Sequence, residues 1–174
     1  FARLAQAMID KEPEFDLTII AFNHALIGIA LCELDIKQDV YNHTQEAYSH
    51  LKKAINQYKD TTNLVYATIL QYTGTLETSL KDYKSSIKHL EKAIIIRKEL
   101  LGSTSIQYAV SIHNLAICHF HLKQYEKVIE LEKEALAIFN LNKNQLYIGT
   151  AHKWMAKSYA HLNKYHLAIP SIKQ

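Results

Sequence analysis

Apolar residues recur with helical spacing along much of the chain. Two segments show the pattern clearly, one through Ile87, Leu90 and Ile94, and the next through Val128, Leu131, Ala135 and Ile138. Spacings of three, four and seven residues place these side chains on one face of a helix. The pattern therefore predicts amphipathic helices that each bury a single face.

The pattern also repeats at a long interval. The segment "SLKDYKSSIKHLEKAIIIR" at 79–97 reappears as "HLKQYEKVIELEKEALAIF" at 121–139, and a shorter copy starts at His161. Aligned on Tyr83, Tyr125 and Tyr165, the copies lie 42 and 40 residues apart. Self-similarity at such a period is typical of folds built from stacked copies.

A small residue stands nine positions before each of these tyrosines, at Gly74, Ala116 and Ala156. Two antiparallel helices approach closely most easily where one side chain at their crossing is small. Each copy is therefore predicted to be a helix, a tight turn and a second helix. The scarcity of Gly and Pro, four and two residues, agrees with an all-α fold.

An earlier, degenerate copy is indicated by Gly28 and Leu34, with Thr44 in place of the tyrosine. We therefore divide a single domain at 1–174 into five parts. They are a stray helix at 1–12, a degenerate repeat at 14–58, repeats at 62–100 and 104–140, and a truncated repeat at 144–174. Nine helices are expected, four pairs and one N-terminal helix. Because the chain starts at Phe1 and stops inside a periodic segment, we expect it to be a fragment of a longer protein.

These features resemble the tetratricopeptide repeat family. The match lies in the small residue, the tyrosine at the turn and a late alanine in the second helix, at Ala54, Ala93 and Ala135. The 40–42-residue spacing exceeds the usual 34 and is similar to the kinesin-light-chain subtype. The family's early Trp and closing Pro are absent, Trp154 standing two positions late. The resemblance implies a right-handed α-solenoid whose first helices line a concave wall.

Wall positions implied by the resemblance carry amides, aromatic rings and cations, a mixture that suits an extended peptide. The candidate partner-binding residues are Gln71, Tyr72, His113, Asn114, Ile117, Phe120, His121, Lys153, Trp154 and Lys157. Asn114 resembles the position at which related proteins hold a ligand backbone. Lys153 and Lys157 share a helix face and favour an anionic partner. The competing interpretations are a solvated Asn114, solvated lysines and a Trp154 that belongs to the core.

Composition excludes several other classes of protein. The chain is 48% hydrophobic and 21% charged, which indicates a globular fold, and no uncharged apolar run reaches the 18 or so residues of a membrane span. The net charge of +3 comes mostly from lysine, with Arg3 and Arg97 the only arginines, which argues against a nucleic-acid binder. Cys32 and Cys118 lie in apolar stretches and fit buried side chains in a reducing, cytoplasmic compartment.

Enzyme and metal chemistry have little support. The chain carries no glycine-rich phosphate loop, GxSxG or HExxH motif, and Glu130, Glu132 and Glu134 are interpreted as a solvated outer face. His119 and His121 are two residues apart and point in different directions on a helix, whereas His113 and His121 are two turns apart. We therefore expect no catalysis, no bound metal and no cofactor.

The leading function is a scaffold that binds a protein or peptide, with an acidic partner favoured, along the concave face. One alternative is the peptide-sensing domain of a bacterial Rap-like or related regulator. A second is a structural arm of a larger protein, and a third is a subunit whose catalytic domain lies outside this chain. An apolar face around Leu167, Ala168 and Ile169 is expected to be covered by further chain or by self-association.

Overall fold

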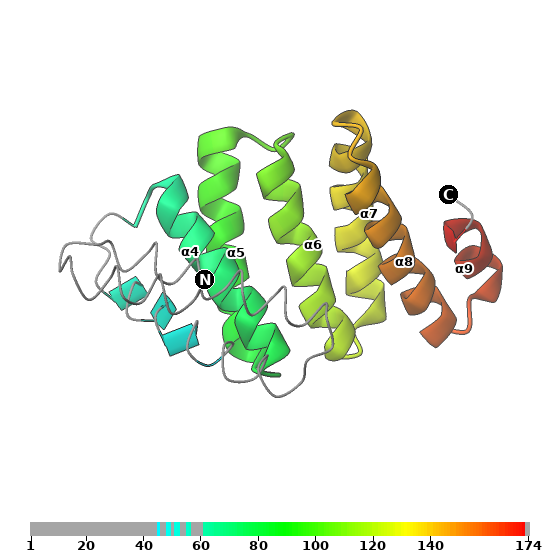
Figure 1. The fold of residues 1–174 in the computed structure, drawn as a ribbon. Helices are drawn as coiled ribbons and strands as arrows, with labels where there is room; N and C mark the ends of the chain where they lie inside the picture. The colour runs from blue at the N-terminus through cyan, green and yellow to red at the C-terminus, as the bar shows by residue number, and fades with distance from the viewer. Residues whose placement is uncertain (1–44, 46–47, 50, 53–54, 57–60, 173–174) are drawn as a thin grey trace, which may run out of the picture.

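The computed structural model describes residues 45, 48–49, 51–52, 55–56 and 61–172. Six α-helices lie within residues 61–172 and are numbered as in Figure 1, and the described residues between 45 and 56 are helical as well. The six helices are α4 (Leu64–Ser79), α5 (Tyr83–Leu101), α6 (Ile106–His121), α7 (Tyr125–Leu141), α8 (Gln145–His161) and α9 (Tyr165–Ile172). Several sequence predictions fall outside the described residues. They concern the stray helix at 1–12, most of the degenerate repeat at 14–58, Gly28 and Cys32. The expected total of nine helices is therefore not tested.

The helices stack in chain order. Figure 1 shows α4 to α9 side by side, and each helix packs against the next one along the chain, with further contacts between α4 and α6 and between α6 and α8. The all-α helical-repeat solenoid predicted from the sequence is therefore confirmed. Because α4, α6 and α8 follow one another on one side of the stack, side chains from successive first helices meet there.

Four of the five connections between these helices have the same backbone structure, and the α5–α6 connection, with Gly102 at φ 81°, differs. Lys81, Lys123, Lys143 and Asn163 adopt left-handed conformations, with φ of 66, 62, 55 and 58°. The residue after each one returns its amide to a carbonyl five positions back, as Asp82 N does to Glu77 O at 2.8 Å. This is the hydrogen bonding of a Schellman helix end. Side-chain caps then start the next helices, with Asn63, Asp82, Ser105 and Asn144 each accepting from an amide three residues on.

The small residues occupy helix crossings, as predicted. Ala116 is fully buried and Ala156 is 4% exposed, while a side chain at Gly74 would meet the neighbouring helix. A Cβ at Gly74 would lie 2.8 Å from Leu90 Cγ and 3.2 Å from Ser86 O. Ser86 Oγ also donates to Gly74 O at 2.7 Å. The α4–α5 crossing therefore requires glycine at this position.

Replacing Gly74 by alanine is expected to lower the free energy of unfolding by about 1–2 kcal/mol, because overpacking of about 1–3 kcal/mol exceeds the helix-propensity gain of about 1 kcal/mol. Gly149 provides a matched control, since it lies inside α8 and a Cβ there meets no atom within 4 Å. Gly149→Ala is expected to raise the free energy of unfolding by about 0.5–1 kcal/mol. Urea unfolding measures both, and equal stabilisation by both substitutions would contradict the close crossing at Gly74.

Two sequence predictions about charged and apolar surface are wrong. Glu132 does not lie on the solvated outer face, because its side chain is fully buried against His113. Ala168 is 6% exposed and packs with Ile129 and Met155, so it is not part of an uncovered end face. Leu167 is 39% exposed, and the side chain of Ile169 lies outside the described residues. Self-association through this end remains a prediction.

Other outer-face glutamates agree with the prediction. Glu130 is exposed and pairs with Lys127 at 2.9 Å. Glu134 is also exposed, and its carboxylate accepts a 2.7 Å hydrogen bond from the Tyr108 hydroxyl. Burial, with this hydrogen bond as a second cause, raises the pKa of Tyr108 to about 12. None of the helices in the described part is both long enough and apolar enough to cross a bilayer.

Candidate functional site

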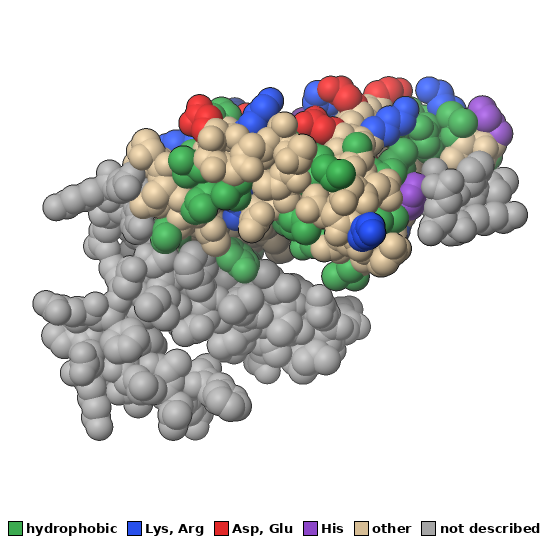
Figure 2. All heavy atoms as spheres, turned by 90° about the horizontal axis from the view of Figure 1, so that it is seen from above, with side chains coloured by type: hydrophobic (Ala, Val, Ile, Leu, Met, Phe, Trp, Pro, Cys, Tyr) green, Lys and Arg blue, Asp and Glu red, His purple; other side chains and the backbone are tan. Residues whose placement is uncertain are grey.

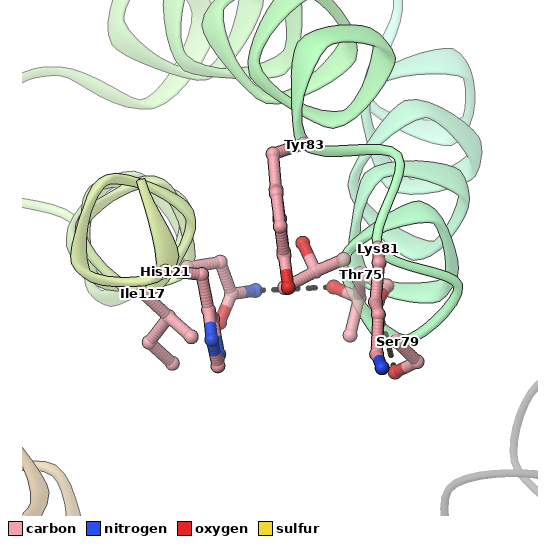
Figure 3. Close-up of a pocket in the computed structure, with 8 residues that line it drawn as sticks. Thr75, Ser79, Lys81, Tyr83, Ile117 and His121 are labelled. Atoms are coloured by element: carbon pink, nitrogen blue, oxygen red, sulfur yellow. Dashed lines mark hydrogen bonds between the residues drawn. The ribbon is translucent and has the colours of Figure 1, made fainter. Parts of the chain in front are cut away.

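A hollow of about 330 Å³ opens between α4 and α6. Its lining consists of Thr75, Thr78, Ser79, Lys81, Tyr83, Asn114, Ile117 and His121. Figure 3 shows Thr75 and Ser79 on one side and Ile117 and His121 on the other, with the Tyr83 ring between them. Three predicted site residues, Asn114, Ile117 and His121, are thus brought together in one place. We call this feature the hollow.

Asn114 contributes the one amide side chain to the lining of the hollow. Its Nδ2 donates to Thr75 Oγ1 across the α4–α6 interface at 3.5 Å, as the dashed line in Figure 3 marks. The Thr75 hydroxyl is itself held, since it donates to Gln71 O at 3.0 Å. Half-buried amides with spare donor and acceptor capacity suit recognition of a peptide backbone. The hollow therefore combines an amide with apolar and aromatic surface.

Aromatic rings continue from the hollow toward α8. Tyr83 stacks on His121 with centroids 5.3 Å apart and planes 5° apart, and Tyr125 stacks on His161 at 4.5 Å and 3°. The tyrosine that starts one second helix thus covers the histidine that ends the following first helix. We call the six rings the aromatic ridge, formed by Tyr83, Phe120, His121, Tyr125, Trp154 and His161.

Phe120 and Trp154 join the two stacked pairs. Their ring centroids are 4.9 Å apart, and Trp154 also lies 6.3 Å from His121. Lys157 places its Nζ 4.6 Å from the Trp154 ring centroid. The predicted residues Phe120, His121, Trp154 and Lys157 therefore form one surface. Sequence reasoning missed the stacking, although the His-Leu-x-x-Tyr pattern at 121–125 and 161–165 could have indicated it.

Three predicted site residues lie elsewhere. His113 is 4% exposed, with its Nδ1 2.9 and 3.0 Å from the two carboxylate oxygens of Glu132, so it belongs to the core and not to the wall. Tyr72 is half-buried and packs against the apolar cluster that contains Leu51. Lys153 is exposed and forms no ion pair with any residue that the structure describes.

The remaining predicted residue, Gln71, leads to a group that sequence reasoning missed. Arg97 extends from α5 between α4 and α6 and is 5% exposed. Its Nη1 donates to Gln71 Oε1, to Gln107 O at 3.1 Å and to Ser111 Oγ at 2.8 Å, and its Nη2 donates to Thr68 Oγ1 at 3.2 Å. Burial lowers the pKa of this guanidinium.

Charge is mixed over the surface. Figure 2 shows acidic and basic side chains interspersed along one long edge of the described part, with hydrophobic and uncharged side chains over much of the adjoining face. No single-sign field of the kind that nucleic-acid binders use covers that edge. Among the described residues, no three or more His, Cys, Asp or Glu side chains are placed to hold a metal ion.

Cys118 is a free thiol in the core, as predicted. Its Sγ lies 2.9 Å from Thr78 Oγ1 and 3.0 Å from Ser86 Oγ. Burial raises the pKa of the thiol, so it remains protonated at neutral pH. It acts as a small packing residue behind the hollow.

This architecture, with paired helices, a small residue at each crossing and a hollow between first helices, defines an α-helical repeat protein. Residues 66–140 match the family model of the tetratricopeptide repeat. No curated protein matches the chain as a sequence relative.

Solved structures show the same fold. BtubC (BKLC) from P. vanneervenii has a TM-score of 0.74 at 15% identity, with 99% of this chain and 68% of that chain covered. A Podosopora anserina putative kinesin light chain with nearly identical TPR-like repeats has a TM-score of 0.72 at 14% identity, with 92% of this chain and 74% of that chain covered. Aspartyl phosphate phosphatase F from Bacillus subtilis has a TM-score of 0.63 at 18% identity, with 90% of this chain and 39% of that chain covered. At 14–18% identity these likenesses show the shared helical-repeat fold.

Proposed function

We propose that the chain is a protein–protein interaction module that binds an extended segment of a partner across the hollow and the aromatic ridge. The observation that supports this proposal best is that the hollow brings Asn114 together with the stacked rings of Tyr83 and His121, which are half-buried and exposed, respectively. Aromatic anchors and half-buried amides are what peptide hot spots use. Tetratricopeptide repeats are typically scaffolds of this kind, which supports the proposal without naming a partner.

In this proposal each part has a separate task. Asn114 bonds the backbone of the bound segment, and one of the segment's side chains enters the hollow against Ile117 and the stacked Tyr83–His121 pair. The following residues cross the ridge toward Trp154. Lys157, whose Nζ lies 4.6 Å from the Trp154 ring centroid, then pairs with a carboxylate of the segment. The free thiol of Cys118 supports the expectation of a reducing, cytoplasmic setting.

A displayed library of random peptides tests the proposal. Peptides enriched on the wild-type chain are expected to bind an Asn114→Ala/His121→Ala variant at least about tenfold more weakly, because hot-spot truncations cost more than about 1–2 kcal/mol. The matched control is Lys127→Ala/Glu130→Ala, an exposed outer pair that should leave affinity unchanged. Failure to enrich any peptide, or equal binding by all three proteins, would contradict binding at the hollow.

The fold likeness to aspartyl phosphate phosphatase F favours a second candidate, a peptide-sensing domain of a larger regulator. A sensor changes its conformation when its signal peptide binds, whereas a scaffold keeps its helix packing. Hydrogen exchange of the chain with and without an enriched peptide separates the two. Protection that spreads from α4–α8 to α9 supports sensing, and protection confined to the lining of the hollow supports the scaffold.

A further inference from the structure

Arg97 is a buried cation without a buried anion. All four of its hydrogen-bond acceptors are neutral, and among the residues that the structure describes no carboxylate pairs with it. Buried charges in proteins are normally paired, because removing an ion from water is costly. The arrangement is therefore incomplete as a purely internal ion site.

The solenoid itself does not need an arginine here. Phe139 stands 42 residues later, at the same repeat position, and is fully buried. It stacks on Tyr147 with centroids 4.9 Å apart and meets His113 edge-on at 6.2 Å. The residues equivalent to Thr68, Gln71, Gln107 and Ser111 are Val110, His113, Tyr147 and Ala151. One interface between successive repeats is thus largely apolar, while its neighbour is polar around a cation.

Donors are left over around this cation. Nη2 makes one of its two possible hydrogen bonds and Nε makes none with the described residues, so these two nitrogens together keep two N–H groups without a described acceptor. The Gln71 Oε1 accepts from Arg97 and from Ser111, which leaves its amide N–H groups without a described acceptor. An Nε/Nη2 edge matches the two oxygens of a carboxylate. Thr68 and Gln71 are half-buried and Gln107 is exposed, so the guanidinium lies just beneath the surface.

We propose that Arg97 and Gln71 form a carboxylate-binding subsite about one helical turn from the hollow, and that the bound segment carries an acidic side chain or a C-terminal carboxylate into it. The inference rests on the proposed function. Along α4 and α6, Gln71 and Ser111 precede Thr75 and Asn114 by four and three residues, about 5–6 Å of helix rise. At about 3.3 Å per extended residue, the carboxylate lies about two residues from the side chain in the hollow.

Acetate provides a direct probe. Arg3 and Arg97 are the only arginines, so a ¹⁵N-labelled chain gives two Nε–H resonances, and the Arg97→Gln variant assigns them by losing one. Titration with sodium acetate against sodium chloride at equal ionic strength is expected to shift the Arg97 resonance saturably and the Arg3 resonance no more than chloride does. An Arg97 resonance that does not respond to acetate would show that Arg97 has a purely structural role and would overturn the proposal.

Enriched peptides supply the second test. Each acidic peptide is compared with its Glu→Gln form and with its C-terminal amide, which separates the two sources of carboxylate. The effective carboxylate is expected to add about 10- to 100-fold in affinity for the wild-type chain and almost nothing for Arg97→Gln, as for a charged hydrogen bond. Arg97→Lys keeps the positive charge but cannot form two parallel hydrogen bonds to a carboxylate. Its gain in affinity from the carboxylate is expected to lie between those of wild type and Arg97→Gln. If Arg97→Gln does not fold, Arg97→Lys assigns the resonances, because it also removes the Arg97 Nε–H, and the wild-type acetate titration and the peptide pairs then test the proposal.

The outcomes separate the two proposals. Peptides that bind at the hollow but contain no required carboxylate, with Arg97→Gln affinity unchanged, would overturn the subsite and leave the proposed function standing. If no peptide is enriched while acetate still shifts the Arg97 resonance, the proposed function fails and the subsite stands.

Discussion

Replacing Glu132 by alanine is expected to lower the free energy of unfolding by about 3 kcal/mol. Glu132 is fully buried on α7, and its partner His113 on α6 is 4% exposed. The substitution leaves the imidazole without its hydrogen-bond partner, at about 1–3 kcal/mol, and opens a small cavity at further cost. The Phe139 and Tyr147 rings lie edge-on to this imidazole and offer no replacement acceptor. Urea unfolding followed by circular dichroism measures the loss.

The matched control is the double variant His113→Leu/Glu132→Leu. Replacing both members of a buried polar pair with apolar residues of similar volume is often neutral or stabilising. The double variant is therefore expected to unfold within about 1 kcal/mol of wild type or above it. A double variant as unstable as Glu132→Ala would mean that the site requires its polar pair.

The same pair gives a pH dependence of defined sign. Burial raises the pKa of the Glu132 carboxyl above its usual 4.5, and the hydrogen bond from His113 offsets only part of this. Because the pKa of this carboxyl is higher in the folded than in the unfolded state, its protonation contributes to stability below pH 4.5. This contribution is lost as the pH rises through the folded-state pKa. The stability of wild type relative to Glu132→Gln is thus expected to fall as pH rises from 4.5. A rise over that range would show that ionisation of Glu132 stabilises the fold.

The fold was predictable because the same arrangement of small and large residues recurs in each repeat. Gly74, Ala116 and Ala156 recur at one offset from the turn tyrosine, and each lies at a helix crossing. A single small residue would have carried little information. Three at a fixed spacing identified which helix faces meet. The left-handed turn residues were less legible, because three of them are lysines and glycine would have been the expected signal.

The site was only partly predictable because wall and core positions alternate on the same helix. His113 and Asn114 are adjacent in sequence, yet one faces Glu132 in the core and the other faces the hollow. Periodicity could not assign a polar residue to either face, since its partner Glu132 is itself a polar residue at a core position. Comparison of repeats would have helped, because Arg97 stands where the next repeat has Phe139.

Phe139→Ala is expected to cost about 4 kcal/mol, among the largest effects for a single side chain in the described part. The ring is fully buried at the junction of α6, α7 and α8, and truncation of a buried Phe costs about 3–5 kcal/mol. Loss of its stack on Tyr147 and its edge contact with His113 adds to the cavity term. Thermal or urea unfolding measures the change.

The position of Phe139 also determines how the variant unfolds. Solenoid stability is approximately a sum of repeat terms and nearest-neighbour interfaces, and Phe139 lies at the interface that couples α6–α7 to α8–α9. Its loss is expected to let α8–α9 unfold at a lower urea concentration than α4–α7, so that the single transition broadens. Leu146→Ala is the control, because that α8 side chain is 73% exposed and should change stability by less than about 0.5 kcal/mol. A loss below about 1.5 kcal/mol for Phe139→Ala, with one sharp transition, would mean that the repeats are coupled through other contacts.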